Sequence, residues 1–173
     1  MLGRFTLLNS IDSFVLTATG MSGSLTYPGT PVVGELYEHF DPTFGNQFFK
    51  CVFNDSGTDI AAGKCAVYKA GSDYLVLVST TILPKGRVAG VCIKGIPDDN
   101  WGYVLIGGSC HGEADAAIAA DADLCLADAS AAHGRLDDVA CAAAGQANDY
   151  WATALTAATN PGDAFHMKVW GLL

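Results

Sequence analysis

Runs of alternating apolar and polar residues, separated by turn-forming residues, make up most of the chain. The clearest run spans residues 164–170, where Phe165, Met167 and Val169 share one parity. Successive side chains of a β-strand point to opposite faces, so this run predicts a half-buried strand. Residues 47–53 alternate in the same way and predict another strand, ending at an Asn-Asp-Ser-Gly turn. The second face of the run at 164–170 carries His166, Lys168 and Trp170.

Two further pairs of runs have the spacing of β-hairpins. Residues 65–69 and 74–79 are mostly apolar, and the short link between them contains Gly and Asp. Such links favour antiparallel pairing of the two strands that they join. Residues 87–94 and 101–107 form the second pair, joined by a turn around Pro-Asp-Asp-Asn. The sequence therefore predicts two successive hairpins.

The stretch at 113–158 is rich in alanine, which by propensity alone favours a helix. Gly134 and Gly145 interrupt the stretch, and its apolar residues keep no clear helical period. The segment Leu-Cys-Leu-Ala at 124–127 and the Gly-containing segment after it are equally typical of a hairpin. We expect strands here, with room for one short helix.

The chain divides by composition into an arm and a body. Residues 1–30 contain a run of Gly, Ser, Thr and Pro that is typical of loop or extended chain, and we expect an N-terminal arm or outer element. Residues 31–173 then form a single β-rich domain. The many glycines favour frequent turns and short strands. The predicted fold class is all-β, as a compact β-barrel or β-sandwich.

Composition narrows the classes of function. Half of the residues are hydrophobic and only 16% are charged, which excludes intrinsic disorder. The formal net charge is -9 and the basic residues form no cluster, so nucleic-acid binding is not expected. No apolar run approaches the ~20 residues that a membrane-spanning helix needs. The N-terminal residues lack the apolar core of a signal peptide, and we expect the protein to be made in a cytoplasm.

The six cysteines favour a reduced state. They are widely spaced, form no Cys-x-x-Cys motif and mostly lie in apolar runs. Cysteine commonly behaves as a small buried hydrophobic residue, so we expect reduced core thiols, with a disulfide framework as the alternative. The positions are Cys51, Cys65, Cys92, Cys110, Cys125 and Cys141.

One cluster of potential metal ligands occurs, at Cys110, His111, Glu113 and Asp115. Metal ligation needs about three or four ligands that converge on one point. Neighbours on a strand point to opposite faces, so Cys110 and His111 would not converge. We therefore predict no metal site and no cofactor.

Acidic residues elsewhere indicate turns rather than catalysis. His39 with Asp41, and Asp98 with Asp99, are candidate acid–base pairs, but Asp-Asp-Asn after a proline is typical of a hairpin turn. Counted from Asp121, an EF-hand would need Gly and Glu where Leu126 and Ala132 stand. No nucleophile elbow, phosphate loop or zinc-protease motif is present. We predict no catalytic residue and no enzyme. The Asp residues that would act with Asp121 in such a calcium-binding loop are Asp123 and Asp128.

A succession of motifs resembles a known family. Asp-Ile-Ala-Ala-Gly at 59–63 precedes a strand, Gly-Arg-Val-Ala-Gly-Val follows at 86–91, and Asn-Trp-Gly-Tyr-Val-Leu-Ile-Gly-Gly follows at 100–108. With Ala-Ile-Ala-Ala-Asp-Ala-Asp-Leu at 117–124, the order is similar to that of the decoration (cement, head-stabilising) proteins of tailed-phage capsids. The resemblance covers roughly residues 45–127. It departs where those families often have Gly before Asp, because Ala120 stands there.

The resemblance implies a virion structural protein. It implies binding to the major capsid protein on the outer capsid surface, as a homo-oligomer for which a trimer is one candidate. Two alternatives stay open: another phage structural protein of the tail, neck or fibre, and a small β-barrel enzyme or carbohydrate-binding module. We expect the arm to supply the contacts. The expected interface residues are Phe5, Leu7, Leu8, Phe14 and Tyr27.

Overall fold

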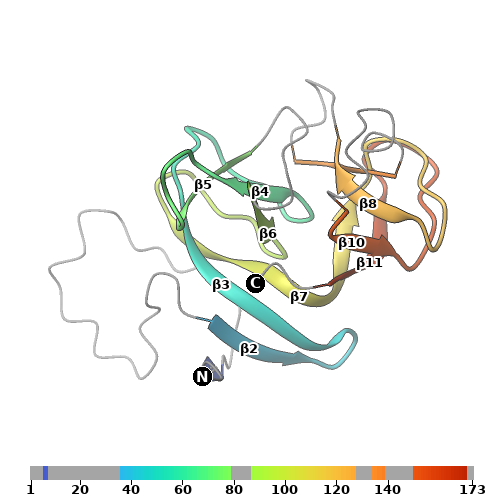
Figure 1. Cartoon of the computed structure of the whole chain (residues 1–173), viewed down its shortest axis with the longest axis horizontal. Coiled ribbons are helices and arrows are strands. Elements are labelled where there is room, and N and C mark those ends of the chain that lie inside the picture. Colours follow the sequence, from blue (N-terminus) through green and yellow to red (C-terminus); the bar gives the residue numbers. More distant parts are fainter. Residues whose placement is uncertain (1–5, 8–35, 79–86, 128–133, 139–149, 171–173) are drawn as a thin grey trace, which may run out of the picture.

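The computed structural model describes residues 6–7, 36–78, 87–127, 134–138 and 150–170 (Figure 1). They form one 11-stranded sheet, and no α-helix occurs within these ranges. The predicted all-β class is therefore confirmed. The strands are β1 (Thr6–Leu7), β2 (Leu36–Asp41), β3 (Gly45–Asn54), β4 (Cys65–Tyr68), β5 (Leu75–Val78), β6 (Val88–Val91), β7 (Trp101–Glu113), β8 (Asp123–Leu126), β9 (Leu136–Asp137), β10 (Ala152–Ala154) and β11 (Ala164–Val169).

The sheet closes on itself through the first half of β7. Hydrogen-bonded neighbours run β3, β5, β4, β6 and β7, and β7 then pairs back onto β3. All of these pairings are antiparallel except β3 with β5, which is parallel. In Figure 1 β4, β5 and β6 lie above β3 and β7, which cross the molecule beneath them. Full pairing removes the exposed edges that would otherwise invite non-specific strand addition.

The second half of β7 begins another circuit. From β7 the order continues through β11, β10 and β8 to β9. An isolated parallel bridge then joins Leu136 in β9 to Ala114, the residue that follows β7. The long strand β7 therefore belongs to two circuits of pairing. Figure 1 shows β8, β10 and β11 grouped on the opposite side of the molecule from β4 and β5.

One turn unit occurs four times in the described residues. Each copy has an isolated bridge residue, then a hydrogen-bonded turn, then a strand: β4, β7, β8 or β11. The bridge residues pair as Ile60 with Ile96 and as Ile118 with Ala158. The third residue of each turn has positive φ, as type II turns require. These residues are Gly63 (83°), Asp99 (54°), Asp121 (63°) and Gly162 (87°).

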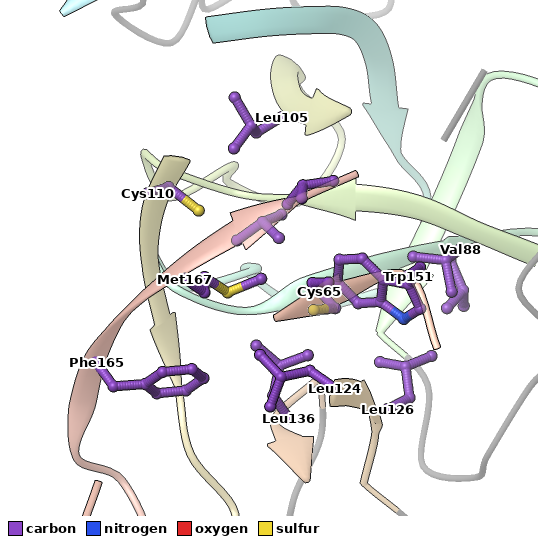
Figure 2. Close-up of a cluster of buried hydrophobic side chains, with 14 of the residues drawn as sticks. Cys65, Val88, Leu105, Cys110, Leu124, Leu126, Leu136, Trp151, Phe165 and Met167 are labelled. Atoms are coloured by element: carbon purple, nitrogen blue, oxygen red, sulfur yellow. The ribbon is translucent and has the colours of Figure 1, made fainter. Parts of the chain in front are cut away.

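Both faces of β4, β6 and the first half of β7 are buried. In β7, Tyr103 and Leu105 belong to one hydrophobic cluster, whereas Val104 and Ile106 belong to another. Strands buried on both faces give near-continuous apolar runs, which explains the sequence Tyr-Val-Leu-Ile. The larger cluster extends from the first circuit to Trp151 before β10, whose side chain is fully buried. Figure 2 shows Cys65, Val88, Leu124, Phe165 and Met167, from strands far apart in sequence, in this cluster.

Two glycines in this circuit allow close approach of the backbone. Gly90 lies where the β4–β6 register shifts, with φ of 147°. A Cβ atom there would lie 2.5 Å from the carbonyl oxygen of Leu105. At Gly102 a Cβ atom would lie 2.6 Å from the side chain of Ile96. Glycine at such positions is typical of bulges and tight strand contacts.

Most predicted elements are confirmed. The strand at 47–53 lies in β3, and the strand at 164–170 is β11, with Phe165, Met167 and Val169 buried. Both predicted hairpins form, as β4–β5 and β6–β7. In the alanine-rich stretch, β8 pairs with β9 as the hairpin interpretation expected. No helix is found in its described part, and the remainder, 128–133 and 139–149, lies outside the described residues.

The arm is described only at β1. Thr6 and Leu7 pair in parallel with Tyr37 and Glu38 of β2. This pairing places the start of the chain along the free side of β2. The other residues of the predicted arm lie outside the described residues, and the division into an arm and a body stays a prediction.

The cysteines depart from the expectation in one respect. Cys51, Cys65, Cys92 and Cys110 are buried thiols, as predicted. Cys125 in β8 is disulfide-bonded, so the prediction of reduced cysteines was wrong for this residue. Distance along the sequence does not decide whether two cysteines meet, because the folded backbone sets their separation.

Candidate functional site

A surface hollow of about 440 Å³ lies over the end of β7, where the two circuits meet. It is lined by the stretch His111–Glu113 of β7 and by Phe44 from the β2–β3 turn. The other lining residues are small or apolar and come from three segments of the chain: Ala62, Gly63, Ile93, Gly162 and Ala164. Two of the recurring turns, at Gly63 and Gly162, thus border the hollow.

Glu113 is the charged residue of the hollow, and it is held in place by two cations. Its Oε1 accepts hydrogen bonds from Lys64 Nζ at 2.8 Å and from Arg135 Nε at 2.5 Å. Burial by itself would raise the pKa of Glu113, but the hydrogen bonds and charges of Lys64 and Arg135 outweigh it and lower that pKa. Arg135 also lies 4.0 Å from Asp115. Glu113 is therefore a fixed anion that connects three segments, rather than a proton donor.

Two histidines lie side by side next to Glu113. His111 in β7 and His166 in β11 are direct cross-strand partners, with ring centroids 6.0 Å apart. The ring of Phe44 approaches each of them edge-on, with both centroid separations at 5.1 Å. His111 is exposed, and Nε2 of His166 is buried without a hydrogen-bond partner in the described part of the chain. This aromatic cluster forms one end of the hollow.

The predicted separation of Cys110 from His111 is confirmed. Cys110 is buried in the core, whereas His111 lies on the opposite, exposed face of β7. Glu113 and Asp115 both contact Arg135 instead of joining the histidine. Among the described residues no group of three or more His, Cys, Asp or Glu side chains is placed to hold a metal ion.

The buried thiols are unsuited to nucleophilic chemistry. Burial raises the pKa of Cys92 to about 12 and the pKa of Cys110 to about 12. Burial also raises the pKa of Cys65 well above its usual value. Because the thiolate is the reactive form, these side chains are packing residues.

Three of the candidate acid–base residues, Asp41, Asp98 and Asp99, serve turns. Asp41 Oδ1 accepts hydrogen bonds from the backbone N–H groups of Thr43 and Phe44 and so fixes the β2–β3 turn. Asp98 Oδ1 accepts from the N–H of Gly57, and Asp99 occupies a left-handed turn position. His39 pairs in register with Gln47, Asp121 lies in a turn, Asp123 begins β8, and Asp128 lies outside the described residues.

Large apolar side chains are exposed at sites that sequence reasoning did not select. Phe40 in β2 is 66% exposed and Trp170, just after β11, is 50% exposed. Of the predicted interface residues, Leu7 lies in β1, while Phe5, Leu8, Phe14 and Tyr27 lie outside the described residues. The signal for Trp170 was present, because it has the parity of the polar face of β11. The signal for Phe40 was weaker, since its neighbours do not alternate cleanly.

Within the described ranges, no helix has the length and apolar character needed to cross a membrane. No family model matches the sequence. No curated protein matches it either. Among solved structures, the chain is similar to the one described as the head fiber gp8.5 N base in bacteriophage phi29. The two are 15% identical, the match covers 71% of this chain and 93% of that chain, and the TM-score is 0.46.

Proposed function

We propose that this chain is a non-enzymatic structural protein of a tailed-phage virion. It binds the outer surface of the capsid, on the major capsid protein, as a homo-oligomer. In that position it holds neighbouring capsomers together. The proposal rests on the succession of motifs that resembles the decoration proteins. It also rests on the turns and close strand contacts that residues of those motifs form.

The observation that carries the proposal is that the motif residues build a rigid body. Ile60 and Ile96 form the bridge that precedes two of the strands, and Gly63 makes the turn into β4. Gly90 and Gly102 permit the close strand contacts of the first circuit. A cement protein needs a stiff body with contact surfaces, and closed strand circuits with a packed core supply stiffness.

The exposed apolar side chains suit contact with another protein. Phe40 lies in β2 and Trp170 just after β11, and Leu155 after β10 is 40% exposed. Aromatic residues are enriched in protein interfaces because one side chain buries a large area at a small cost in entropy. The pairing of β1 with β2 means that the edge of β2 opposite β3 can pair with another strand.

The enzyme or carbohydrate-binding alternative gains no support from the hollow. Its carboxylate, Glu113, is already neutralised by Lys64 and Arg135. The rest of its lining is small or apolar apart from the exposed His111. A catalytic pocket brings several polar groups toward one substrate position. We therefore advance no second function.

The test is binding to shells of the cognate major capsid protein that lack a decoration protein. Full-length protein is expected to co-sediment with the shells, and a chain beginning at residue 31 is expected to bind at least about tenfold more weakly, equivalent to ~1.4 kcal/mol. Circular dichroism of the truncated chain checks that its β-structure remains. A second comparison in the full-length protein uses Leu8→Asp against Tyr74→Ser, which changes a 37% exposed side chain outside the arm.

Two outcomes would count against the proposal in different ways. Equal binding of the full-length and truncated chains would remove the arm from the interface but keep the capsid as partner. Failure of the folded full-length protein to bind such shells would overturn the proposed function itself.

A further inference from the structure

His111 and His166 form a non-hydrogen-bonded cross-strand pair. The backbone N–H of His166 donates to Thr156 Oγ1, and its carbonyl oxygen accepts from the N–H groups of Leu155 and Thr156. Its backbone groups thus point away from β7, although His111 is its register partner there. In antiparallel sheets such non-hydrogen-bonded pairs bring the Cα atoms to ≈ 4.5 Å, with the side chains closest.

The two imidazoles consequently share one face of the sheet at chelating separation. A metal ion bound by two imidazole nitrogens at ≈ 2.0–2.1 Å places the ring centres about 5–6 Å apart. The observed separation of the ring centroids is 6.0 Å. His111 is exposed and reaches solvent beside the hollow, so a metal ion has a route to the pair.

The histidine pair contains a buried nitrogen atom that lacks a hydrogen-bond partner among the described residues. This atom is Nε2 of His166. A buried polar atom without a partner has lost its hydrogen bond to water and gained none in return, so such an atom in a folded protein calls for an explanation. Phe44 packs edge-on against both rings and forms an apolar cover over them. Rotation of the Phe44 side chain would uncover both imidazole rings.

We propose that His111 and His166 form a two-histidine binding site for a borderline divalent metal ion such as Zn²⁺. Imidazole is a preferred ligand of Zn²⁺, Ni²⁺ and Cu²⁺. Water completes the coordination, because Glu113 is held by its two cations and Cys110 lies on the far face of the strand. The ion joins β7 to β11 and so ties the last strand to the strand shared by both circuits.

The site suits a stabilising role more than a catalytic one. With two protein ligands its affinity is below that of four-ligand structural zinc sites, whose protein ligands fill the coordination sphere. Binding to the folded state alone raises its stability by mass action. At a zinc concentration 100-fold above the dissociation constant, the melting temperature should rise by roughly 5–10 °C.

Calorimetric titration of the full-length protein with Zn²⁺ tests the proposal. Wild type is expected to bind one ion, and His111→Gln and His166→Gln are each expected to weaken binding at least tenfold and to abolish the rise in melting temperature. The matched controls are His39→Gln and His133→Gln, which make the same chemical change at the other two histidines. Phe44→Ala, which removes the cover, is expected to speed metal association.

His111 is exposed, so its substitution leaves the fold intact and keeps the test interpretable. The proposal is overturned if wild type binds no zinc up to about 1 mM, a concentration at which even weak sites fill. It is also overturned if binding persists in His111→Gln, or if the control variants lose it equally. Neither outcome bears on capsid binding, which is measured separately.

Discussion

At the scale of single residues, the third position of the recurring turn has a left-handed backbone, and its four described copies fill that position in two ways. Gly63 and Gly162 use glycine, whereas Asp99 and Asp121 use aspartate. Glycine adopts positive φ freely, and Asp is among the few other residues that tolerate it. In the turn at 119–122 the left-handed position is held by Asp121.

The free-energy cost of a positive φ can be measured in one turn that uses glycine and in one turn that uses aspartate. A Cβ atom at Gly162 would meet no atom closer than 3.5 Å, so Gly162→Ala tests backbone strain rather than a clash. We expect Gly162→Ala to lower the free energy of unfolding by about 1–2 kcal/mol. The control Asp121→Gly should stay within about 0.5 kcal/mol of wild type, because relief of strain offsets the greater freedom of its unfolded chain. Urea unfolding with an unchanged slope gives both values, and wild-type stability of Gly162→Ala would contradict the turn assignment.

At the scale of elements, the ion cluster on Glu113 fastens segments that are far apart in sequence. Lys64 precedes β4, Glu113 ends β7 and Arg135 precedes β9. The side chain of Glu113 is 20% exposed, so its pairs are less screened than those at the surface. The cluster therefore links the two circuits at the rim of the hollow.

We expect Glu113→Gln to lower the free energy of unfolding at pH 7 by about 1 kcal/mol. The folded-state pKa of Glu113 is lowered, so its contribution is present above the unfolded value of about 4.3 and is lost as pH falls through the folded pKa. Wild type and variant should therefore converge in stability as the pH falls below the folded-state pKa of Glu113. Asp55→Asn is the control, because the Lys69–Asp55 pair is more exposed and should be worth less than about 0.5 kcal/mol. Equal decreases in the free energy of unfolding of the two variants would contradict the expectation that partial burial strengthens the ion pairs of Glu113.

At the scale of the whole molecule, β7 is the strand on which the fold depends. It pairs with β3 over its first half and with β11 over its second, and the larger hydrophobic cluster extends across both circuits. A body organised in this way presents β1, Phe40 and Trp170 at its outside. Under the proposed function, these surfaces are candidates for contact with a second copy or with the capsid.

The proposed homo-oligomer can be tested directly by mass. Light scattering after size exclusion at neutral pH is expected to give about three times the 17.9 kDa of one chain, because a closed trimer is the candidate that the resemblance to decoration proteins implies. A chelator should leave the mass unchanged, since the proposed zinc site lies within one chain. A monomer would remove the oligomeric part of the proposal, and a mass that falls with chelator would place the metal between chains.

Local pattern was enough to predict much of the fold. The strand at 164–170 and the two hairpins follow from period-two alternation and short turns, which act over a few residues. The turn role of Asp98 and Asp99 followed from residue type in the same way. The recurring turn unit was not predicted, because its four copies are unevenly spaced along the chain and two of them replace glycine by aspartate.

The sequence by itself therefore determined the all-β class, most strand positions and the separation of Cys110 from His111, since each depends on neighbours within one strand. Only the tertiary structure decided which strands pair at a distance: β3 with β5 in parallel, β7 with β11, and β1 with β2. It also brought Glu113 to Lys64 and Arg135, and His111 to His166. These contacts depend on strand register across long loops, and the burial of two hydrophobic clusters selects that register because a one-residue shift would turn apolar faces outward.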